Sequence, residues 1–266
     1  VSIPIMIMLI FMDYKTISKI SPILYILILI SLIAVLFTKS VNGATSWFTI
    51  GGISIQPAEF AKIIVIIALA TYISRIQENG RDQISRPTRL LLALLIVAVP
   101  VLLIIKQPDY GTACTFVVAT IFILFSAGIK KRYIIAGILL TVIIIPTLYF
   151  FVLPEHAKTR IDVFLNPNLD PRGAGYNVIQ SKLAIGAGEF LGMGILKGNQ
   201  TQLGFLYPKS TDFIFAVIGE EMGFVVAATV IITYVILITK SIYIAKTAKD
   251  NLGSYIAIGI AGIFLF

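Results

Sequence analysis

Long apolar stretches separated by short polar segments dominate this sequence. A helix that crosses a bilayer needs about 17–25 mostly apolar residues, and several stretches reach or approach that length. The two runs at the ends are shorter, so we expect them to be parts of helices and the chain to be a fragment truncated at both ends. The pattern predicts about eight membrane helices, at 1–12, 22–38, 57–74, 88–105, 112–128, 133–152, 212–239 and 252–266.

The basic residues between these stretches predict the orientation. Twelve lysines and arginines flank one set of alternate connections, whereas the short connections of the other set carry only Lys39 and Lys106. Cytoplasmic connections of membrane proteins are enriched in lysine and arginine. We therefore expect the segments around 39–56, 106–111 and 153–211 to lie outside the cell.

The long outer loop, 153–211, is the one place where the composition changes. The run Asn166-Pro-Asn-Leu-Asp-Pro-Arg-Gly-Ala-Gly is rich in turn-forming residues. Residues 177–196 are only moderately apolar and include Gln180, Lys182 and Glu189. This segment predicts an interfacial or re-entrant helix within the loop.

Composition agrees with an all-α, polytopic membrane protein that forms a single domain over 1–266. Apolar residues make up 58% of the chain, charged residues 13%, and the mean hydropathy is +0.97, which excludes an ordinary soluble domain. The net charge of +8 does not indicate a nucleic-acid partner, because the basic residues are dispersed between apolar runs. One cysteine and one histidine argue against a disulfide framework and a histidine-rich zinc site.

Ionisable residues at or inside membrane spans are costly and are therefore candidates for function. Glu59 and Lys62 lie three positions apart in Gln56-Pro-Ala-Glu-Phe-Ala-Lys, on one face of a predicted helix. An intrahelical ion pair explains them without any further role. Asp109 lies in Gln107-Pro-Asp-Tyr-Gly-Thr, where it can act as a helix cap or as a functional carboxylate.

A third group of acids lies at the outer start of the span at 212–239. Asp212 precedes Glu220 and Glu221 by about two helical turns. Helix capping explains Asp212 but not the two deeper acids. Trp47, the only tryptophan, lies on a predicted outer loop, where an interfacial anchor is the ordinary role.

These motifs, together with Gly175-Tyr-Asn-Val-Ile-Gln-Ser-Lys-Leu-Ala-Ile-Gly and Thr211-Asp-Phe-Ile-Phe-Ala-Val-Ile-Gly-Glu-Glu, resemble the SEDS family (shape, elongation, division, sporulation) in order and spacing. The run Gln200-Thr-Gln-Leu-Gly-Phe-Leu is closer to the elongation branch than to the division branch. The resemblance implies ten membrane helices in a full-length protein.

The resemblance also implies a peptidoglycan glycosyltransferase of the bacterial cytoplasmic membrane. Such an enzyme polymerises lipid II at the outer face, beside a class B penicillin-binding protein, and contacts membrane lipids. Asp212 falls on the family's essential aspartate, the expected general base. The substrate-binding candidates are Trp47, Glu59, Lys62, Asp109, Arg160, Gln180, Lys182, Gln202, Glu220 and Glu221. A divalent cation, magnesium or manganese, could share the charge of the pyrophosphate; its ligands are unknown.

Two other functions remain open on the residues alone. A flippase for the same lipid-linked precursor would place ion-coupling residues near the midplane, in pseudo-symmetric halves. Here the acids gather near the outer edge and no two halves match, which favours the polymerase. A non-catalytic scaffold of the cell-wall machinery would need neither Asp212 nor the deeper acids.

Overall fold

The computed structural model describes residues 6–7, 10–38, 45–50, 53–152, 155–206 and 211–266. Their contacts separate into two compact units, and each is described by itself. The first unit comprises Val1–Ile134 and Ile236–Phe266, and the second comprises Ile135–Val235. The single domain expected over 1–266 stays a prediction.

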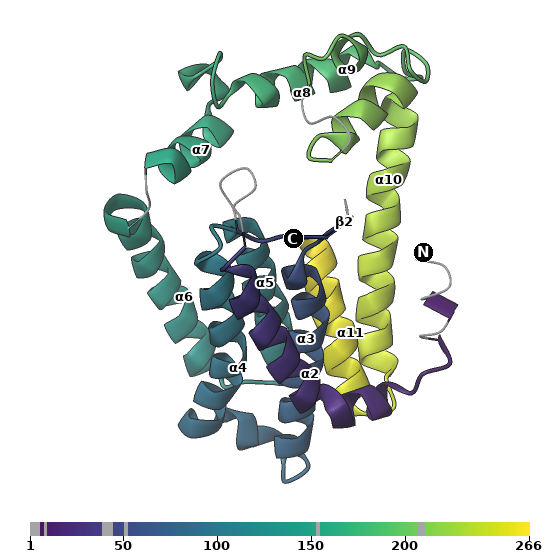
Figure 1. Cartoon of the computed structure of the whole chain (residues 1–266). Coiled ribbons are helices and arrows are strands. Elements are labelled where there is room, and N and C mark those ends of the chain that lie inside the picture. The colour runs from purple at the N-terminus through teal and green to yellow at the C-terminus, as the bar shows by residue number, and fades with distance from the viewer. Residues whose placement is uncertain (1–5, 8–9, 39–44, 51–52, 153–154, 207–210) are drawn as a thin grey trace. The chain divides into compact units, whose positions relative to one another are not determined.

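The first unit is a bundle of apolar helices. In chain order these are α2 (Tyr14–Val35), α3 (Pro57–Gln77), the short 3₁₀ helix η1 (Arg81–Ser85), α4 (Pro87–Ile105), α5 (Tyr110–Ser126), the end of α10 (Ile214–Thr247) and α11 (Asn251–Leu265). Helix α3 packs against α2, α4, α5 and α11, and α11 also packs against α5 (Figure 1). Helix α3 is thus the centre of the unit.

Local sequence signals set where these helices begin. Pro57 and Pro87 occupy the first turns of α3 and α4, where a missing backbone N–H has no cost. The side chains of Asp13, Asp109 and Asp250 cap α2, α5 and α11, each by accepting a backbone N–H of the first turn. The predicted cap at Asp109 is confirmed.

Small residues bring α5 and α11 close together. A Cβ added to Gly262 of α11 would lie 2.7 Å from the Cα of Ala119, and one added to Gly259 would lie 2.9 Å from the Cδ1 of Ile123. Close approach through glycine and alanine is how membrane helices gain packing energy, because lipid supplies little hydrophobic drive between helices.

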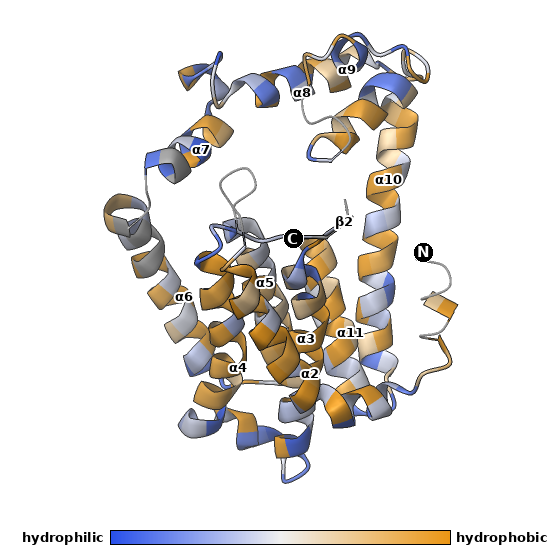
Figure 2. Ribbon diagram, viewed as in Figure 1, coloured by the Kyte–Doolittle hydropathy of each residue, from blue (hydrophilic) through white to orange (hydrophobic). Residues whose placement is uncertain are grey.

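The helical membrane architecture predicted from the sequence is confirmed. Helices α2, α3, α4 and α10 are long and apolar enough to cross a membrane, and α5 and α11 are shorter apolar helices. Hydrophobic residues dominate these helices (Figure 2). Many of their apolar side chains are exposed, as expected for helices that face lipid. Within the described residues, seven of the eight predicted spans coincide with helices; the run at 1–12 lies largely outside them.

The second unit contains the long loop, which is mostly helical. It comprises most of α6 (Lys131–Thr147), a π-helical turn η2 (Leu148–Val152), α7 (Glu155–Leu165), the 3₁₀ turn η3 (Pro167–Leu169), α8 (Tyr176–Ala187), α9 (Asn199–Gln202) and the first part of α10. The helix expected at 177–196 ends nine residues early, at Ala187. Gly188 is its C-cap, and the next residue, Glu189, has a left-handed φ of +48°, which ends the helix.

A small hairpin was not expected from the sequence. Strands β1 (Phe48–Ile50) and β2 (Ile53–Ile55) pair antiparallel, with Phe48 opposite Ile55 and Thr49 opposite Ser54. Each strand has three residues, and the hairpin leads directly into α3. The all-α class therefore holds for the fold, with this hairpin as a local addition.

Asp250 gives the first unit a pH-dependent contact. Its carboxylate accepts the Gly253 N–H at 2.8 Å and lies 3.0 Å from both the Lys15 Nζ and the Tyr14 hydroxyl. The Gly253 N–H, helped by Lys15 and Tyr14, lowers the pKa of Asp250 below its ordinary value of 3.8. A lowered pKa means that the contact stabilises the fold above that value and that the stabilisation is lost as the pH falls below it.

We expect Asp250→Ala to lower the free energy of unfolding by about 1 kcal/mol at pH 7, through loss of the helix cap. Asp250→Asn should lose less, because an amide oxygen still accepts the Gly253 N–H. Thermal unfolding in detergent from pH 7 to pH 3 checks this. The gap between wild type and Asp250→Asn should close below about pH 4. A constant gap would contradict the ion pair, and Asp82→Asn serves as the control because Asp82 has no described hydrogen bond.

Candidate functional site

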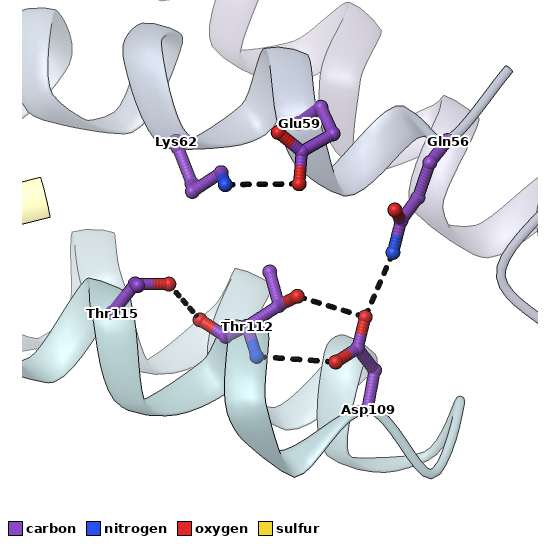
Figure 3. A network of polar contacts seen from close by, with 6 residues as sticks. All are labelled: Gln56, Glu59, Lys62, Asp109, Thr112 and Thr115. Atoms are coloured by element: carbon purple, nitrogen blue, oxygen red, sulfur yellow. Dashed lines mark hydrogen bonds and ion pairs between the residues drawn. The ribbon is translucent and has the colours of Figure 1, made fainter. Parts of the chain in front are cut away.

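A row of polar side chains links the starts of α3 and α5 in the first unit (Figure 3). The Gln56 Nε2 donates to the Asp109 Oδ2 at 2.8 Å. Thr112 donates twice to the same carboxylate, from its backbone N at 3.1 Å and from its hydroxyl at 2.8 Å. Asp109 is therefore both a helix cap and the bridge between two helices.

The predicted pair of Glu59 and Lys62 is confirmed in α3. The Lys62 Nζ lies 2.9 Å from the Glu59 Oε1, and both side chains lie in the space between α3 and α5 (Figure 3). The Lys62 side chain is 18% exposed and that of Glu59 is 54% exposed. An ammonium group has three donors, so the Lys62 ammonium keeps capacity for a further acceptor beyond Glu59.

Trp47 and Gln107 lie close to the same helix ends. Gln107 is fully buried, and its side-chain Nε2 donates to the Leu32 carbonyl at 3.2 Å. The backbone carbonyl of Gln107 accepts the Ser46 hydroxyl at 3.3 Å. The Trp47 carbonyl accepts the Thr38 hydroxyl at 3.3 Å. These bonds fix the backbone around Trp47, whose side chain is partly exposed.

Asp212 lies in a turn of the second unit, immediately before α10. Helix α10 begins at Ile214, and the backbone N–H groups of Ala216 and Val217 donate to the Phe213 carbonyl. The Asp212 side chain is exposed, and within the described residues it accepts no hydrogen bond and forms no ion pair. Capping, the ordinary explanation that the sequence offers for this residue, is absent there.

Glu220 has a clear structural partner. Its side chain is fully buried and accepts the backbone N–H of Gln200 at 2.7 Å, that of Thr201 at 3.0 Å, and the Thr201 hydroxyl. Hydrogen bonds to an ionised group are about twice as strong as neutral ones. Glu220 thus holds the start of α9 against α10, rather than pointing to Asp212.

Glu221 and Gln202 form the next contact along the same seam, with the Gln202 Nε2 donating to the Glu221 Oε1 at 2.9 Å. Backbone hydrogen bonds join the same two segments: the Glu220 and Glu221 carbonyls accept the N–H groups of Met193 and Gly194, each at 2.9 Å. We call the joined segments 188–202 and 219–225 the loop seam.

Helix α10 breaks at Gly223, and the loop seam satisfies the broken backbone. Gly223 has φ +76°, and the helical hydrogen bonds of α10 are interrupted at this residue. The freed N–H groups of Phe224 and Val225 donate to the Glu189 and Phe190 carbonyls, at 3.0 and 3.3 Å. A break inside an apolar helix is stable only where other groups take up the freed donors and acceptors, as they do here.

The remaining candidates lie elsewhere in the second unit. Arg160 on α7 and Lys182 on α8 are exposed, and neither has a hydrogen bond or ion pair within the described residues. Gln180 on α8 is half-buried, and its Oε1 is a buried acceptor without a described donor. These residues are placed on helices of the long loop but are not joined to one another.

The candidates thus separate into distinct environments. Glu59, Lys62 and Asp109 share one polar row, whereas Glu220, Glu221 and Gln202 share the loop seam. Sequence reasoning missed Gln56, Thr112 and Thr201 as polar partners. Thr112 follows Asp109 by one turn of helix, a spacing that could have indicated the contact.

The described residues contain no group of three or more histidine, cysteine or acidic side chains that could hold a metal ion. The oxygen ligands that magnesium prefers are therefore not assembled in the described part of the chain. The divalent cation stays a prediction, and no step below depends on it.

Four glycines make the loop seam possible. A Cβ added to Gly188 would lie 1.8 Å from the Gly219 carbonyl oxygen, and one added to Gly223 would lie 2.3 Å from the Gly192 backbone N. Gly188 and Gly192, like Gly219 and Gly223, lie four positions apart. This small-xxx-small spacing lets two backbone segments approach closely in a membrane protein.

We expect Gly188→Ala to lower the free energy of unfolding by about 1–3 kcal/mol, because its Cβ would force the two backbones apart. Gly186→Ala is the matched control: a Cβ at Gly186 meets nothing within 4 Å, and alanine in a helix is favoured by about 0.5–1 kcal/mol. Thermal midpoints in detergent should move in opposite directions. Equal midpoints would show that the seam is not tightly packed.

Comparison with known proteins identifies the family. A sequence model of the cell cycle protein family of FtsW, RodA and SpoVE matches residues 1–266. The chain belongs to this family. It is 37% identical over 247 residues to the peptidoglycan glycosyltransferase MrdB of Escherichia coli (strain K12), which covers 90% of this chain and 64% of that protein. It is 38% identical over 225 residues to the probable peptidoglycan glycosyltransferase FtsW of Trichlorobacter lovleyi. That alignment covers 84% of this chain and 57% of that protein.

Solved structures of the family have the same fold. A chain from a peptidoglycan synthase complex, described for its coordination of polymerization and crosslinking, is 27% identical with a TM-score of 0.75, covering 97% of this chain and 70% of that one. The crystal structure of Thermus thermophilus RodA, a rod shape determining protein, matches with a TM-score of 0.64 at 23% sequence identity. The match covers 97% of this chain and 66% of that one. This FtsW/RodA/SpoVE-family chain spans less than two thirds of the length of the two curated relatives.

Proposed function

We propose that the protein to which this chain belongs is a peptidoglycan glycosyltransferase that polymerises lipid II at the outer face of the bacterial cytoplasmic membrane, for cell elongation, shape or division. The observation that carries the proposal is the 37% identity to MrdB, a peptidoglycan glycosyltransferase, over 90% of this chain. The multi-pass helical architecture supports it, because lipid II is a membrane-bound substrate and its enzyme must work at the bilayer surface.

In the proposed reaction Asp212 is the general base. Its carboxylate takes the proton from a sugar hydroxyl of the acceptor while that oxygen bonds to the anomeric carbon of the donor. The bond from this carbon to the undecaprenyl pyrophosphate breaks, and the pyrophosphate leaves with the electron pair. An exposed carboxylate without a described partner supports this role, because no structural contact competes for its lone pairs.

The leaving pyrophosphate needs positive charge nearby. Lys62, Arg160 and Lys182 are the candidates: Lys62 keeps donors free beside its ion pair, and the other two are exposed. Arginine can bind phosphate oxygens through two parallel hydrogen bonds, and lysine acts as a point charge. The Glu59 carboxylate then has the role of orienting Lys62, and Asp109 that of holding α3 to α5.

The proposed partner is a class B penicillin-binding protein, whose transpeptidase would crosslink the new strands. The similarity to a chain of a peptidoglycan synthase complex that couples polymerization and crosslinking supports this partner.

The test is lipid II polymerisation by the purified full-length protein together with its transpeptidase partner. Glycan strands longer than the disaccharide, detected on a gel with labelled lipid II, would support the glycosyltransferase. No polymer, together with movement of labelled lipid II across the membrane of sealed vesicles, would replace it with a flippase. Neither polymer nor transport, with the partner's crosslinking still dependent on this protein, would leave only a scaffold.

A further inference from the structure

A groove of about 730 Å³ opens on the surface of the first unit between α5, the end of α10 and α11. This volume lies within the roughly 300–1,000 Å³ typical of small-molecule sites. Its walls divide into two parts. Isoleucine and phenylalanine side chains form the apolar part, and the polar part consists of Gln77, Arg81, Ser126, Lys246, Asn251, Ser254 and Tyr255.

The polar part carries two cations and no acid. Arg81 and Lys246 line it, whereas no aspartate or glutamate does. The Arg81 guanidinium donates one hydrogen bond, to the Ser126 carbonyl at 3.3 Å, and so has most of its five donors available. Lys246 forms no hydrogen bond or ion pair within the described residues. The net positive charge of the groove is therefore uncompensated there.

The polar wall is held in place by contacts of its own. The Tyr255 hydroxyl donates to the Gln77 Oε1, and the Gln77 Nε2 donates to the carbonyls of Ala127 at 2.9 Å and Arg81 at 3.1 Å. Gln77 is buried, so these bonds are shielded from water. The backbone that carries Arg81 is thus fixed next to the apolar wall formed by Phe122, Phe125 and neighbouring isoleucines.

We propose that this groove binds one anionic phospholipid of the cytoplasmic leaflet. Its phosphate would lie between Arg81 and Lys246, and an acyl chain along Ile121, Phe122, Ile242 and Ile258. Arg81 and Lys246 belong to the connections whose basic residues predict a cytoplasmic location. The lipids of that leaflet carry negative charge, and basic pockets between membrane helices on that side bind their head groups.

Charge and shape together select this occupant. A free phosphate would use the cations but leave the apolar wall exposed, and a neutral lipid would use the wall but not the cations. The polymerase site proposed above plays no part in this binding, so either proposal can fail without the other.

The experiment titrates phosphatidylglycerol and phosphatidylcholine into the full-length protein in detergent and counts bound lipids by native mass spectrometry. We expect one phosphatidylglycerol to bind more tightly than phosphatidylcholine. Neutralising one basic residue near an anionic head group should weaken binding about fivefold, and two about 25-fold. Lys246→Gln carries the test, because Arg81→Gln also removes the contact with Ser126. Lys249→Gln is the matched control, a basic residue near the same end of α11 that does not line the groove.

Four results would overturn the proposal. Equal binding of the two lipids would remove the role of charge, and equal loss in Lys246→Gln and Lys249→Gln would reduce it to general surface attraction. Glycerol 3-phosphate competing as well as the whole lipid would show that the apolar wall is not used. Absence of any bound lipid in the full-length protein would show that the groove is filled by protein.

Discussion

Asp212→Asn is expected to reduce lipid II polymerisation by about 10²–10⁴-fold, the range that general bases contribute. An amide has nearly the shape of a carboxylate but cannot take a proton from the acceptor hydroxyl. Because the Asp212 side chain is exposed and has no partner within the described residues, the substitution should change the free energy of unfolding by less than about 0.5 kcal/mol. Activity and stability are therefore predicted to separate.

The measurement is the initial rate of strand formation by the full-length protein with its partner, next to its thermal midpoint in detergent. Glu189→Gln is the matched control, since Glu189 is another exposed acid of the second unit and its side chain has no described hydrogen bond. Asp212→Glu should retain part of the rate, because it keeps a carboxylate one methylene further out. A rate unchanged in Asp212→Asn would remove this residue from the chemistry, even if the protein polymerises lipid II.

The apolar pattern predicted the helices well because it reports directly on the lipid environment. Runs of about 20 apolar residues have few alternatives to a spanning helix, since every backbone group must be paired inside the bilayer. Helix starts were also readable, as at Pro57 and Asp109, where the local signal acts within one turn. The early end of α8 was not predicted, although Gly188 is a glycine at its C-cap.

The polar contacts were predicted less completely, because they depend on which helices pack together. The pair of Glu59 and Lys62 is local and was read correctly. The bond from Gln56 to Asp109 joins residues 53 positions apart, so spacing alone gives no sign of it. The loop seam had a signal that was overlooked: the two small-xxx-small pairs, one containing Gly188 and the other Gly223.

The buried Glu220 gives the second large expectation. Glu220→Ala should release α9 from α10, because it leaves the N–H groups of Gln200 and Thr201 without their acceptor. Hydrogen bonds to a charged group contribute about 1.5–3 kcal/mol each, so the local loss should reach several kcal/mol. Hydrogen exchange of the Gln200 and Thr201 amides in the full-length protein measures it directly, and both should exchange much faster than in wild type.

The adjacent acid supplies the control for this expectation. Glu221→Gln keeps an oxygen that can accept the Gln202 amide, so its effect on exchange should be small. Glu220→Gln should also speed exchange, by less than Glu220→Ala, because it keeps one acceptor oxygen while its NH₂ would face the donors of the second carboxylate oxygen. Polymerisation should fall in both Glu220 variants if α9 must be held for the enzyme to work. Unchanged exchange in both would show that glycine packing alone maintains the loop seam, and Glu220 would then return to the list of substrate-binding candidates.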